Sequence, residues 1–303
     1  MRPLATFLIS ALLFAQQNPQ PPQNPAAATD DDIEFVCPMD KDVRSKVPGK
    51  CPRCGMTLVA GIPDVHEYPV RITTKPSVPK AGEDVELRFR VEDPITSQPV
   101  RDFEIMHERL YHLFVVSQDT KFFVHTHPQV KPDGSLDLSL KFPHAGLYRV
   151  LSDFYPKGGT PQLIASSVFV QGAVQGERFK LEPAKLQPDL GAQHSENLEV
   201  ELVTDPPAPI AGFKTLMFFK LKPNEGIEQY IGAWGHMLAA SSDLIDMIHT
   251  HPFLVTDPVE GGYKQIQFNL IFPRAGIYRV WIQFQRKGVV NTVAFNIPVK
   301  TLD

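Results

Sequence analysis

Hydrophobic and polar residues alternate in short runs along most of this chain. One alternating segment runs from Val85 to Val91 and another from Thr215 to Leu221, and each follows an Ala-Gly pair. Alternation with a period of two is typical of β-strands that bury one face. The 29 prolines and 19 glycines supply many turns between the runs, and no long helical periodicity is visible. The pattern therefore predicts an all-β protein.

The chain also contains an internal duplication. Residues 142–150 read Phe-Pro-His-Ala-Gly-Leu-Tyr-Arg-Val, and residues 272–280 read Phe-Pro-Arg-Ala-Gly-Ile-Tyr-Arg-Val. The Ala-Gly-x-Tyr-Arg-Val part is similar to the tyrosine corner of immunoglobulin-like sandwiches, and a repeat of about 110 residues suits seven or so strands. We predict two tandem immunoglobulin-like β-sandwich repeats, at residues 64–172 and 196–303, joined by a connector at 173–195.

The N-terminus has the layout of a secretory signal peptide. Arg2 precedes an apolar run from Leu4 to Ala15, and a polar sequence rich in Gln, Asn and Pro follows. The apolar run is too short to cross a bilayer. We expect a signal peptide at 1–15 and a disordered linker at 16–32, because the linker has almost nothing to bury. The mature protein is then expected to have no membrane span and to be periplasmic or secreted.

Sulfur-containing side chains gather in one short segment after the linker. The segment contains all three cysteines and two methionines, namely Cys37, Met39, Cys51, Cys54 and Met56. Thiolate and thioether sulfur are soft ligands, which suit Cu(I), Ag(I) or Zn(II). The Cys-x-x-Cys-Gly knuckle brings two sulfurs together, and a return of the chain through residues 43–47 places Cys37 beside them. We predict a metal-binding module at 33–63, with the three cysteines as ligands and the two methionines as optional weaker ligands.

Residues 35–59 closely resemble the heavy-metal-binding domain attached to bacterial copper and silver efflux components and to copper-transporting ATPases. The motif is Cys-Pro-Met, then Cys-Pro-Arg-Cys-Gly-Met. The family usually has a histidine directly after Cys-Pro-Met, whereas this chain has Asp40. The resemblance implies a role in heavy-metal homeostasis or resistance, with copper or silver as the metal. It also implies a metal efflux pump or another metal-accepting protein as the partner.

Three alternatives remain for the cysteines. They could form a structural zinc knuckle, a Cys51–Cys54 disulfide that leaves Cys37 unpaired, or a thioredoxin-like redox pair. No βαβ pattern surrounds the Cys-x-x-Cys, which disfavours the redox pair. An odd number of cysteines in an exported protein favours a metal cluster over a disulfide framework.

Each repeat carries three histidines with the same spacing. They are His112, His125 and His127 in the first repeat, and His236, His249 and His251 in the second. If Ser117–Thr120 forms a four-residue hairpin loop, His112 lies opposite His125, and Ser241–Leu244 places His236 opposite His249 in the same way. Residue i+2 shares the face of residue i, so the third histidine joins each pair.

Three neutral imidazoles form a good site for Cu(II), Zn(II) or Ni(II), with an open position for a further ligand. We therefore predict an independent histidine site in each sandwich. The parity of a continuous strand places His107 away from this site. The alternative is that the histidines are hydrogen-bonding or packing residues that both copies inherited from the duplication.

Other functions find little support in the sequence. The net charge of −4 offers no basic surface for nucleic acid. No nucleophile elbow, phosphate-binding loop or dinucleotide fingerprint is present. An open three-histidine site could serve an oxidase or a hydrolase, but no base stands beside it in the sequence. We expect a protein that is not an enzyme and that sequesters or transfers copper- or silver-type ions. The alternative is a structural or interaction protein with a zinc-stabilised cysteine module.

Overall fold

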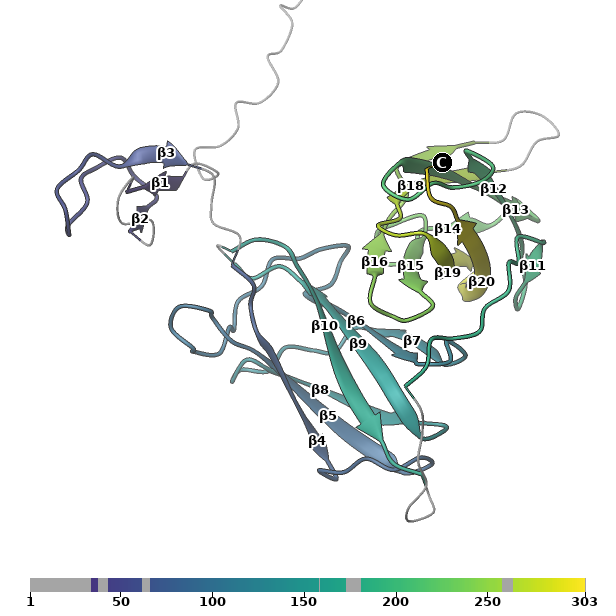
Figure 1. Ribbon diagram of the computed structural model, residues 1–303, viewed down its shortest axis with the longest axis horizontal. Coiled ribbons are helices and arrows are strands. Elements are labelled where there is room, and N and C mark those ends of the chain that lie inside the picture. The colour runs from purple at the N-terminus through teal and green to yellow at the C-terminus, as the bar shows by residue number, and fades with distance from the viewer. Residues whose placement is uncertain are drawn as a thin grey trace, which may run out of the picture. The chain divides into compact units, whose positions relative to one another are not determined.

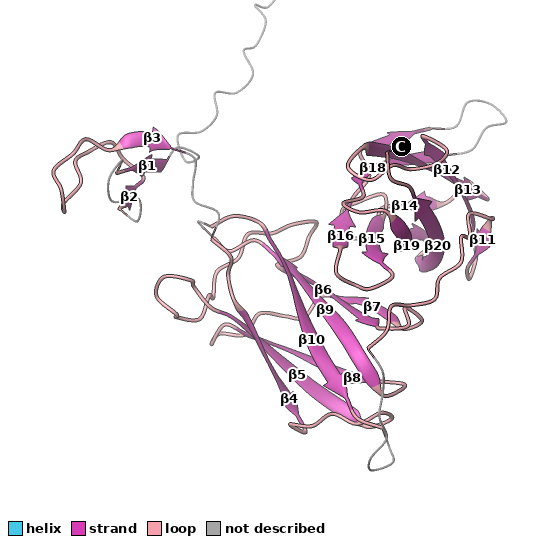
Figure 2. Cartoon of the chain, viewed as in Figure 1, coloured by secondary structure: helices cyan, strands magenta, loops and turns pink. Residues whose placement is uncertain are grey.

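The computed structural model describes residues 34–37, 43–61, 66–157, 159–172, 181–257 and 264–302, and its regular structure there consists of β-strands (Figures 1 and 2). The chain divides into two compact units after Asp64. The predicted signal peptide and the linker at 16–32 lie outside the described residues. No described segment forms a helix with the length and apolar character needed to cross a membrane.

The first unit contains a small antiparallel sheet in the order β2-β1-β3. Its strands are β1 (Glu34–Val36), β2 (Arg44–Ser45) and β3 (Val59–Gly61). Phe35 pairs with Ser45 on one side and with Ala60 on the other. Among the described residues of this unit, Cys37, Cys51 and Leu58 are buried, and Phe35 and Val43 pack against them. Two of the three buried residues are cysteines, so the described core is small and lies around the thiols.

The first sandwich of the second unit consists of two antiparallel sheets, in the orders β4-β5-β8 and β10-β9-β6-β7. The strands are β4 (Val70–Lys75), β5 (Asp84–Val91), β6 (Tyr111–Ser117), β7 (Phe123–Thr126), β8 (Ser135–Lys141), β9 (Gly146–Phe154) and β10 (Gln162–Val170). Alternate residues of β5 are buried, as its sequence pattern predicts. The inward residues of both sheets form one core, which includes Phe89, Leu113 and Val150.

The second sandwich repeats this arrangement with three short additional strands, β11, β14 and β17. Its sheets run β11-β12-β13-β18-β17 and β14-β19-β15-β16, and β20 pairs with β19. The strands are β11 (Gln193–His194), β12 (Glu199–Asp205), β13 (Lys214–Lys222), β14 (Ile227–Glu228), β15 (His236–Ser241), β16 (Met247–Thr250), β17 (Leu254–Thr256), β18 (Gln265–Ile271), β19 (Gly276–Arg286) and β20 (Val289–Val299). The predicted fold class, a cysteine-rich module followed by two immunoglobulin-like sandwiches, is confirmed.

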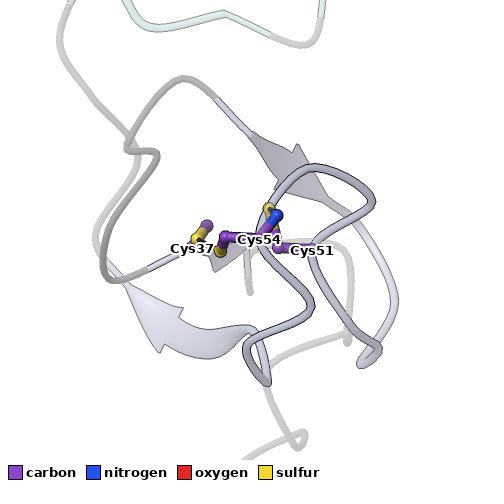
Figure 3. A group of neighbouring side chains, drawn as sticks. All are labelled: Cys37, Cys51 and Cys54. Carbon is purple, nitrogen blue, oxygen red and sulfur yellow. Dashed lines mark hydrogen bonds between the residues drawn. The ribbon is translucent and has the colours of Figure 1, made fainter.

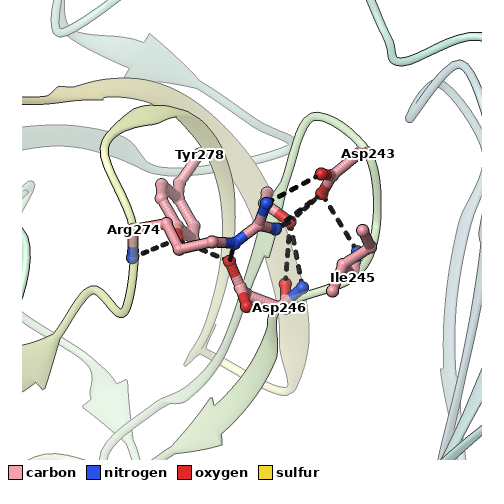
Figure 4. A network of polar contacts seen from close by, with 6 residues as sticks. Asp243, Ile245, Asp246, Arg274 and Tyr278 are labelled. Atoms are coloured by element: carbon pink, nitrogen blue, oxygen red, sulfur yellow. Dashed lines mark hydrogen bonds and ion pairs between the residues drawn. The ribbon is translucent and has the colours of Figure 1, made fainter.

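The two repeated tyrosines anchor loops, in line with the tyrosine-corner prediction. The Tyr148 hydroxyl donates to the backbone oxygen of His144 at 2.8 Å. The Tyr278 hydroxyl donates to the Asp246 carboxylate at 2.8 Å and accepts from the Arg274 backbone nitrogen at 3.2 Å (Figure 4). Arg274 also forms an ion pair with Asp243 at 3.0 Å, so the β15–β16 turn is fixed to the turn before β19.

Strands β6 and β15 are buried on both faces. One face of each strand packs into the core of its own sandwich. The opposite faces meet in a third apolar cluster, which contains Phe114 and Leu151 from the first sandwich and Leu238 and Trp281 from the second. Phe123 stacks on Trp281 there, with ring centroids 5.0 Å apart and planes 11° apart. The two sandwiches therefore share an apolar interface.

Candidate metal centres

Cys37, Cys51 and Cys54 come together in the first unit, as predicted (Figure 3). Their sulfur atoms all lie within 4.8 Å of one another, and none of the three residues forms a disulfide. The Sγ atoms of Cys37 and Cys54 are 3.4 Å apart. Two sulfurs that share one ion at about 2.3 Å each lie about 3.8 Å apart in tetrahedral geometry. The three thiols are therefore close to the arrangement that a single bound ion requires.

Local backbone bonds explain why the sulfurs converge. The Gly55 nitrogen donates to the Cys51 oxygen at 2.9 Å, and the Cys51 nitrogen donates to the Met56 oxygen at 2.8 Å. Gly55 has a φ of +75°, which glycine adopts without strain. The Cys37 nitrogen donates to the Val43 oxygen at 3.0 Å, so the returning chain holds Cys37 beside the knuckle, as the sequence indicated.

The two predicted methionine ligands are not part of this group of thiols. Met56 is 40% exposed. Met39 and Asp40 lie outside the described residues, so the prediction of Met39 as a ligand stays a prediction. The three thiols are the candidate ligands that the described part of this unit brings together.

The six predicted histidines form one group in the second unit, which we call the histidine cluster: His112, His125, His127, His236, His249 and His251. Ligand nitrogens of His112, His125 and His236 lie within 4.8 Å of one another, as do those of His236, His249 and His251. Each of these sets contains His236, and the first draws on both repeats. Each predicted triad does converge, since Nε2 of His127 lies 3.1 Å from both Nδ1 of His112 and Nε2 of His125 in the first repeat. The two triads are not separate groups, however, because the shared interface brings them together.

The predicted pairing of the histidines is also wrong by two residues. Phe114 pairs with His125, and Leu238 pairs with His249. In the first repeat, Ser117 belongs to the strand and its hydroxyl accepts from the Phe122 nitrogen at 2.9 Å. The Asp119 carboxylate accepts from the Lys121 nitrogen at 3.1 Å, which draws Lys121 into the loop. A shift of two residues preserves the face, so the histidines still lie on the same side of the sheet.

Hydrogen bonds across the interface orient one histidine of each repeat. Gln283 of the second sandwich lies with Oε1 2.7 Å from Nδ1 of His125 in the first. Asp153 of the first sandwich lies with Oδ2 2.5 Å from Nδ1 of His249 in the second. Asp153 and Gln283 occupy equivalent positions, since Asp153 pairs with His112 and Gln283 pairs with His236. Sequence reasoning missed both residues, because neither lies near the histidines in the chain.

Burial keeps the histidines neutral. It lowers the pKa of His236 to about 4, that of His127 to about 3 and that of His125 to about 2. Burial also raises the pKa of Asp153 to about 6. Neutral imidazoles have a nitrogen lone pair available to a metal ion at pH 7 without loss of a proton.

His107 contacts the cluster, contrary to the parity argument. Its ring stacks on His251, with centroids 3.6 Å apart. The strand is not continuous here, because His107 and Glu108 both have positive φ and β6 begins only at Tyr111.

The sequence did contain a sign of the shared interface. The residues around Phe114 and around Leu238 are apolar without interruption, whereas a strand that exposes one face alternates between apolar and polar residues.

Comparisons with known proteins match two parts of the chain. Residues 35–60 match the family model described as Heavy metal binding domain. Residues 64–172 and 182–301 match the model described as Domain of unknown function (DUF8832). No curated protein matches the chain.

Several solved structures are similar to this chain at low identity. The adhesin FdeC of Escherichia coli has 15% identity and a TM-score of 0.27, over 82% of this chain and 71% of that one. A segment of two fibronectin type-III domains from chicken tenascin has 11% identity and a TM-score of 0.23, over 77% and 99% of the two chains. The ICAM-5 D1–D4 ectodomain fragment has 12% identity and a TM-score of 0.23, over 83% and 59%.

Proposed function

We propose that this chain, which belongs to the family of the Domain of unknown function (DUF8832), is an exported protein that sequesters or transfers copper- or silver-type ions. The observation that carries the proposal is the convergence of Cys37, Cys51 and Cys54 within a segment that matches the heavy-metal-binding domain. The function is binding and delivery rather than catalysis. The apolar run from Leu4 to Ala15 supports export.

The number of thiols favours a soft monovalent ion over structural zinc. A structural zinc site almost always has four protein ligands, whereas three cysteines are the whole complement of this chain. Cu(I) and Ag(I) bind well to two or three soft sulfur ligands. Cys37 and Cys51 are buried and Cys54 is partly exposed, so one edge of the sulfur group is open to solvent. An open edge suits a site that receives an ion from one protein and passes it to another.

A titration of the anaerobic full-length protein with Cu(I) against a competing chelator tests the proposal. One equivalent should bind tightly, and the affinity should fall at lower pH because the thiols must lose protons to ligate. Cys51→Ser should abolish this equivalent, whereas Met56→Leu should weaken it far less. If Cys51→Ser binds as tightly as the parent, the shared sulfur site is wrong. Preference for Zn(II) over Cu(I) in direct competition would favour the structural alternative.

A further inference from the structure

Four members of the histidine cluster have fixed tautomers, because each turns one ring nitrogen toward an oxygen that accepts. Nε2 of His112 lies 3.0 Å from the Met106 backbone oxygen, and Nε2 of His236 lies 2.8 Å from the Tyr230 backbone oxygen. A carbonyl oxygen can only accept, so both Nε2 atoms carry the proton and both Nδ1 atoms are lone pairs.

The same reasoning applies to the two histidines oriented across the interface. Gln283 Nε2 donates to the Thr292 hydroxyl at 3.0 Å, which leaves its Oε1 to accept from His125. Asp153 accepts from His249. The Nε2 atoms of His125 and His249 are therefore lone pairs as well. Metal-bound histidines typically have their second nitrogen held by a carboxylate or carbonyl oxygen in this way.

These four imidazoles lie at the corners of a near-regular tetrahedron. The six distances between the ring centroids of His112, His125, His236 and His249 all fall between 5.4 and 5.9 Å. A tetrahedral ion bound at about 2.0–2.1 Å by four imidazoles holds the ring centroids about 5 Å apart. The observed spacing is slightly wider than this. The donor nitrogens of His112, His125 and His236 already lie within 4.8 Å of one another, and that of His249 lies within the same distance of His236.

Without a cation, this arrangement is costly. The Nε2 atom of His249 is buried and has no hydrogen-bond partner among the described residues. Nδ1 of His112 and Nε2 of His125 lie 3.4 Å apart and share a single neighbouring nitrogen, Nε2 of His127, which lies 3.1 Å from each. A buried acceptor without a partner costs about 1–3 kcal/mol. A bound cation satisfies all of these lone pairs at once.

We propose that His112, His125, His236 and His249 bind one borderline divalent ion, of the Zn(II) or Cu(II) type, at a centre shared by the two sandwiches. Neutral imidazole suits these ions and does not suit Mg(II) or Ca(II). Additional ligands stand next to the four. Nε2 of His127 lies 3.1 Å from His112 Nδ1, and Nε2 of His251 lies 3.0 Å from His236 Nδ1. The centre uses none of the cysteines and stands independently of the proposed sulfur site.

The centre has a route to solvent. A cleft of about 540 Å³ is lined by residues that include His125, Gln283 and Trp281. His127 and His251 are each partly exposed at the edge of the cluster. An ion can therefore reach the buried histidines without separation of the sandwiches.

The test uses the full-length chain with Cys37→Ser, Cys51→Ser and Cys54→Ser, so that only the histidines can bind. Zn(II) is titrated against a chromophoric chelator, and Mg(II) serves as the negative control. We expect one tightly bound equivalent per chain. His125→Asn from the first repeat and His249→Asn from the second should each weaken that same equivalent by more than the roughly 10–100-fold typical of changes outside the ligand shell. His66→Asn, a change at an exposed histidine outside both the cluster and the cleft, should have no effect.

The shared centre is overturned if two equivalents bind and each variant removes only one of them. It is also overturned if no Zn(II) binds at micromolar concentration, or if the cluster variants behave like His66→Asn. A second measurement needs no change in the cluster and so does not depend on the folding of the variants. Co(II) bound to the cysteine-free chain should show the intense visible absorption of tetrahedral cobalt, and only the weak bands of octahedral cobalt would contradict four-imidazole coordination.

Discussion

Asp153 of the first sandwich accepts a hydrogen bond from His249 of the second, with Oδ2 and Nδ1 2.5 Å apart. Gln283 makes the reciprocal contact with His125 from the equivalent position of the other repeat. His249 is thus hydrogen-bonded to a carboxylate, whereas His125 is hydrogen-bonded to a neutral amide. A carboxylate increases the basicity of the imidazole that it holds and adds a negative charge near a bound cation.

This difference predicts opposite effects for two conservative changes. Asp153→Asn should weaken Zn(II) binding by about tenfold, because the negative charge of the carboxylate is lost while the shape of the side chain is retained. Gln283→Glu should strengthen Zn(II) binding, because it gives His125 the partner that His249 already has. Both are measured by chelator competition in the cysteine-free chain. Equal affinities for the two variants and the parent would show that neither residue acts on the ion.

Acid should destabilise the metal-free protein below the ordinary pKa of histidine. Burial lowers the pKa of every member of the histidine cluster, to about 4 for His236 and about 3 for His127. In the unfolded chain these groups return to about 6.5. Above that pH neither state takes up protons at them. Below it the unfolded chain binds protons that the folded protein does not, so the free energy of unfolding falls, by about 1.4 kcal/mol per pH unit for each buried histidine that stays neutral.

The pKa shift of Asp153 has the opposite effect on stability, but it involves one carboxyl, whereas the cluster contains six histidines. Burial raises its pKa to about 6, so the folded carboxyl takes up its proton at a higher pH than the unfolded one. Protonation of Asp153 therefore favours the folded state as the pH falls below 6. Urea denaturation of metal-free protein between pH 8 and pH 4.5 measures the sum. A free energy of unfolding that does not change between pH 7 and pH 5 would contradict the predicted loss of stability in acid. A His127→Asn, His251→Asn double variant should lose less stability over the same pH range.

Much of the fold followed from local sequence. The alternation from Val85 to Val91 and the motif around Tyr148 depend on backbone geometry and on which face is buried, and both are properties of short segments. The cysteine group was also predictable, because a knuckle and one returning strand bring Cys37 to Cys54 within a single small sheet.

The shared histidine centre was not predictable in the same way. A hairpin argument places His125 relative to its own sheet but carries no information on how one sandwich docks against the other. The two-residue register error left the face of the histidines unchanged, since the strand period is two. The docking depends on side chains distant in sequence, such as Phe123 and Trp281. The runs without alternation in β6 and β15 were the available sign that a second face had to be covered.

The interface should therefore contribute to stability apart from any metal. Phe123→Ala removes the ring that stacks on Trp281 and should lower the free energy of unfolding by about 1–3 kcal/mol, less than for a fully buried phenylalanine. Phe213→Ala is the control, because Phe213 is 50% exposed and should tolerate truncation. Thermal denaturation of the metal-free chain distinguishes the two. Equal melting temperatures for Phe123→Ala and Phe213→Ala would show that the stacking contact does not hold the sandwiches together.

The cysteine unit, by contrast, should depend on its metal for folding. Among its described residues only Cys37, Cys51 and Leu58 are buried, and domains of fewer than about 40 residues usually need a metal or disulfides to be stable. Removal of Cu(I) with a strong chelator should collapse the dispersion of amide NMR signals from residues 43–61 while signals from the sandwiches stay in place. Cys51→Ser should reproduce the metal-free spectrum even with Cu(I) present, whereas Met56→Leu should retain the folded one. Dispersed signals from this unit after the chelator has removed Cu(I) would mean that the unit folds without the ion. The three thiols would then be a binding site on a sheet that is already folded.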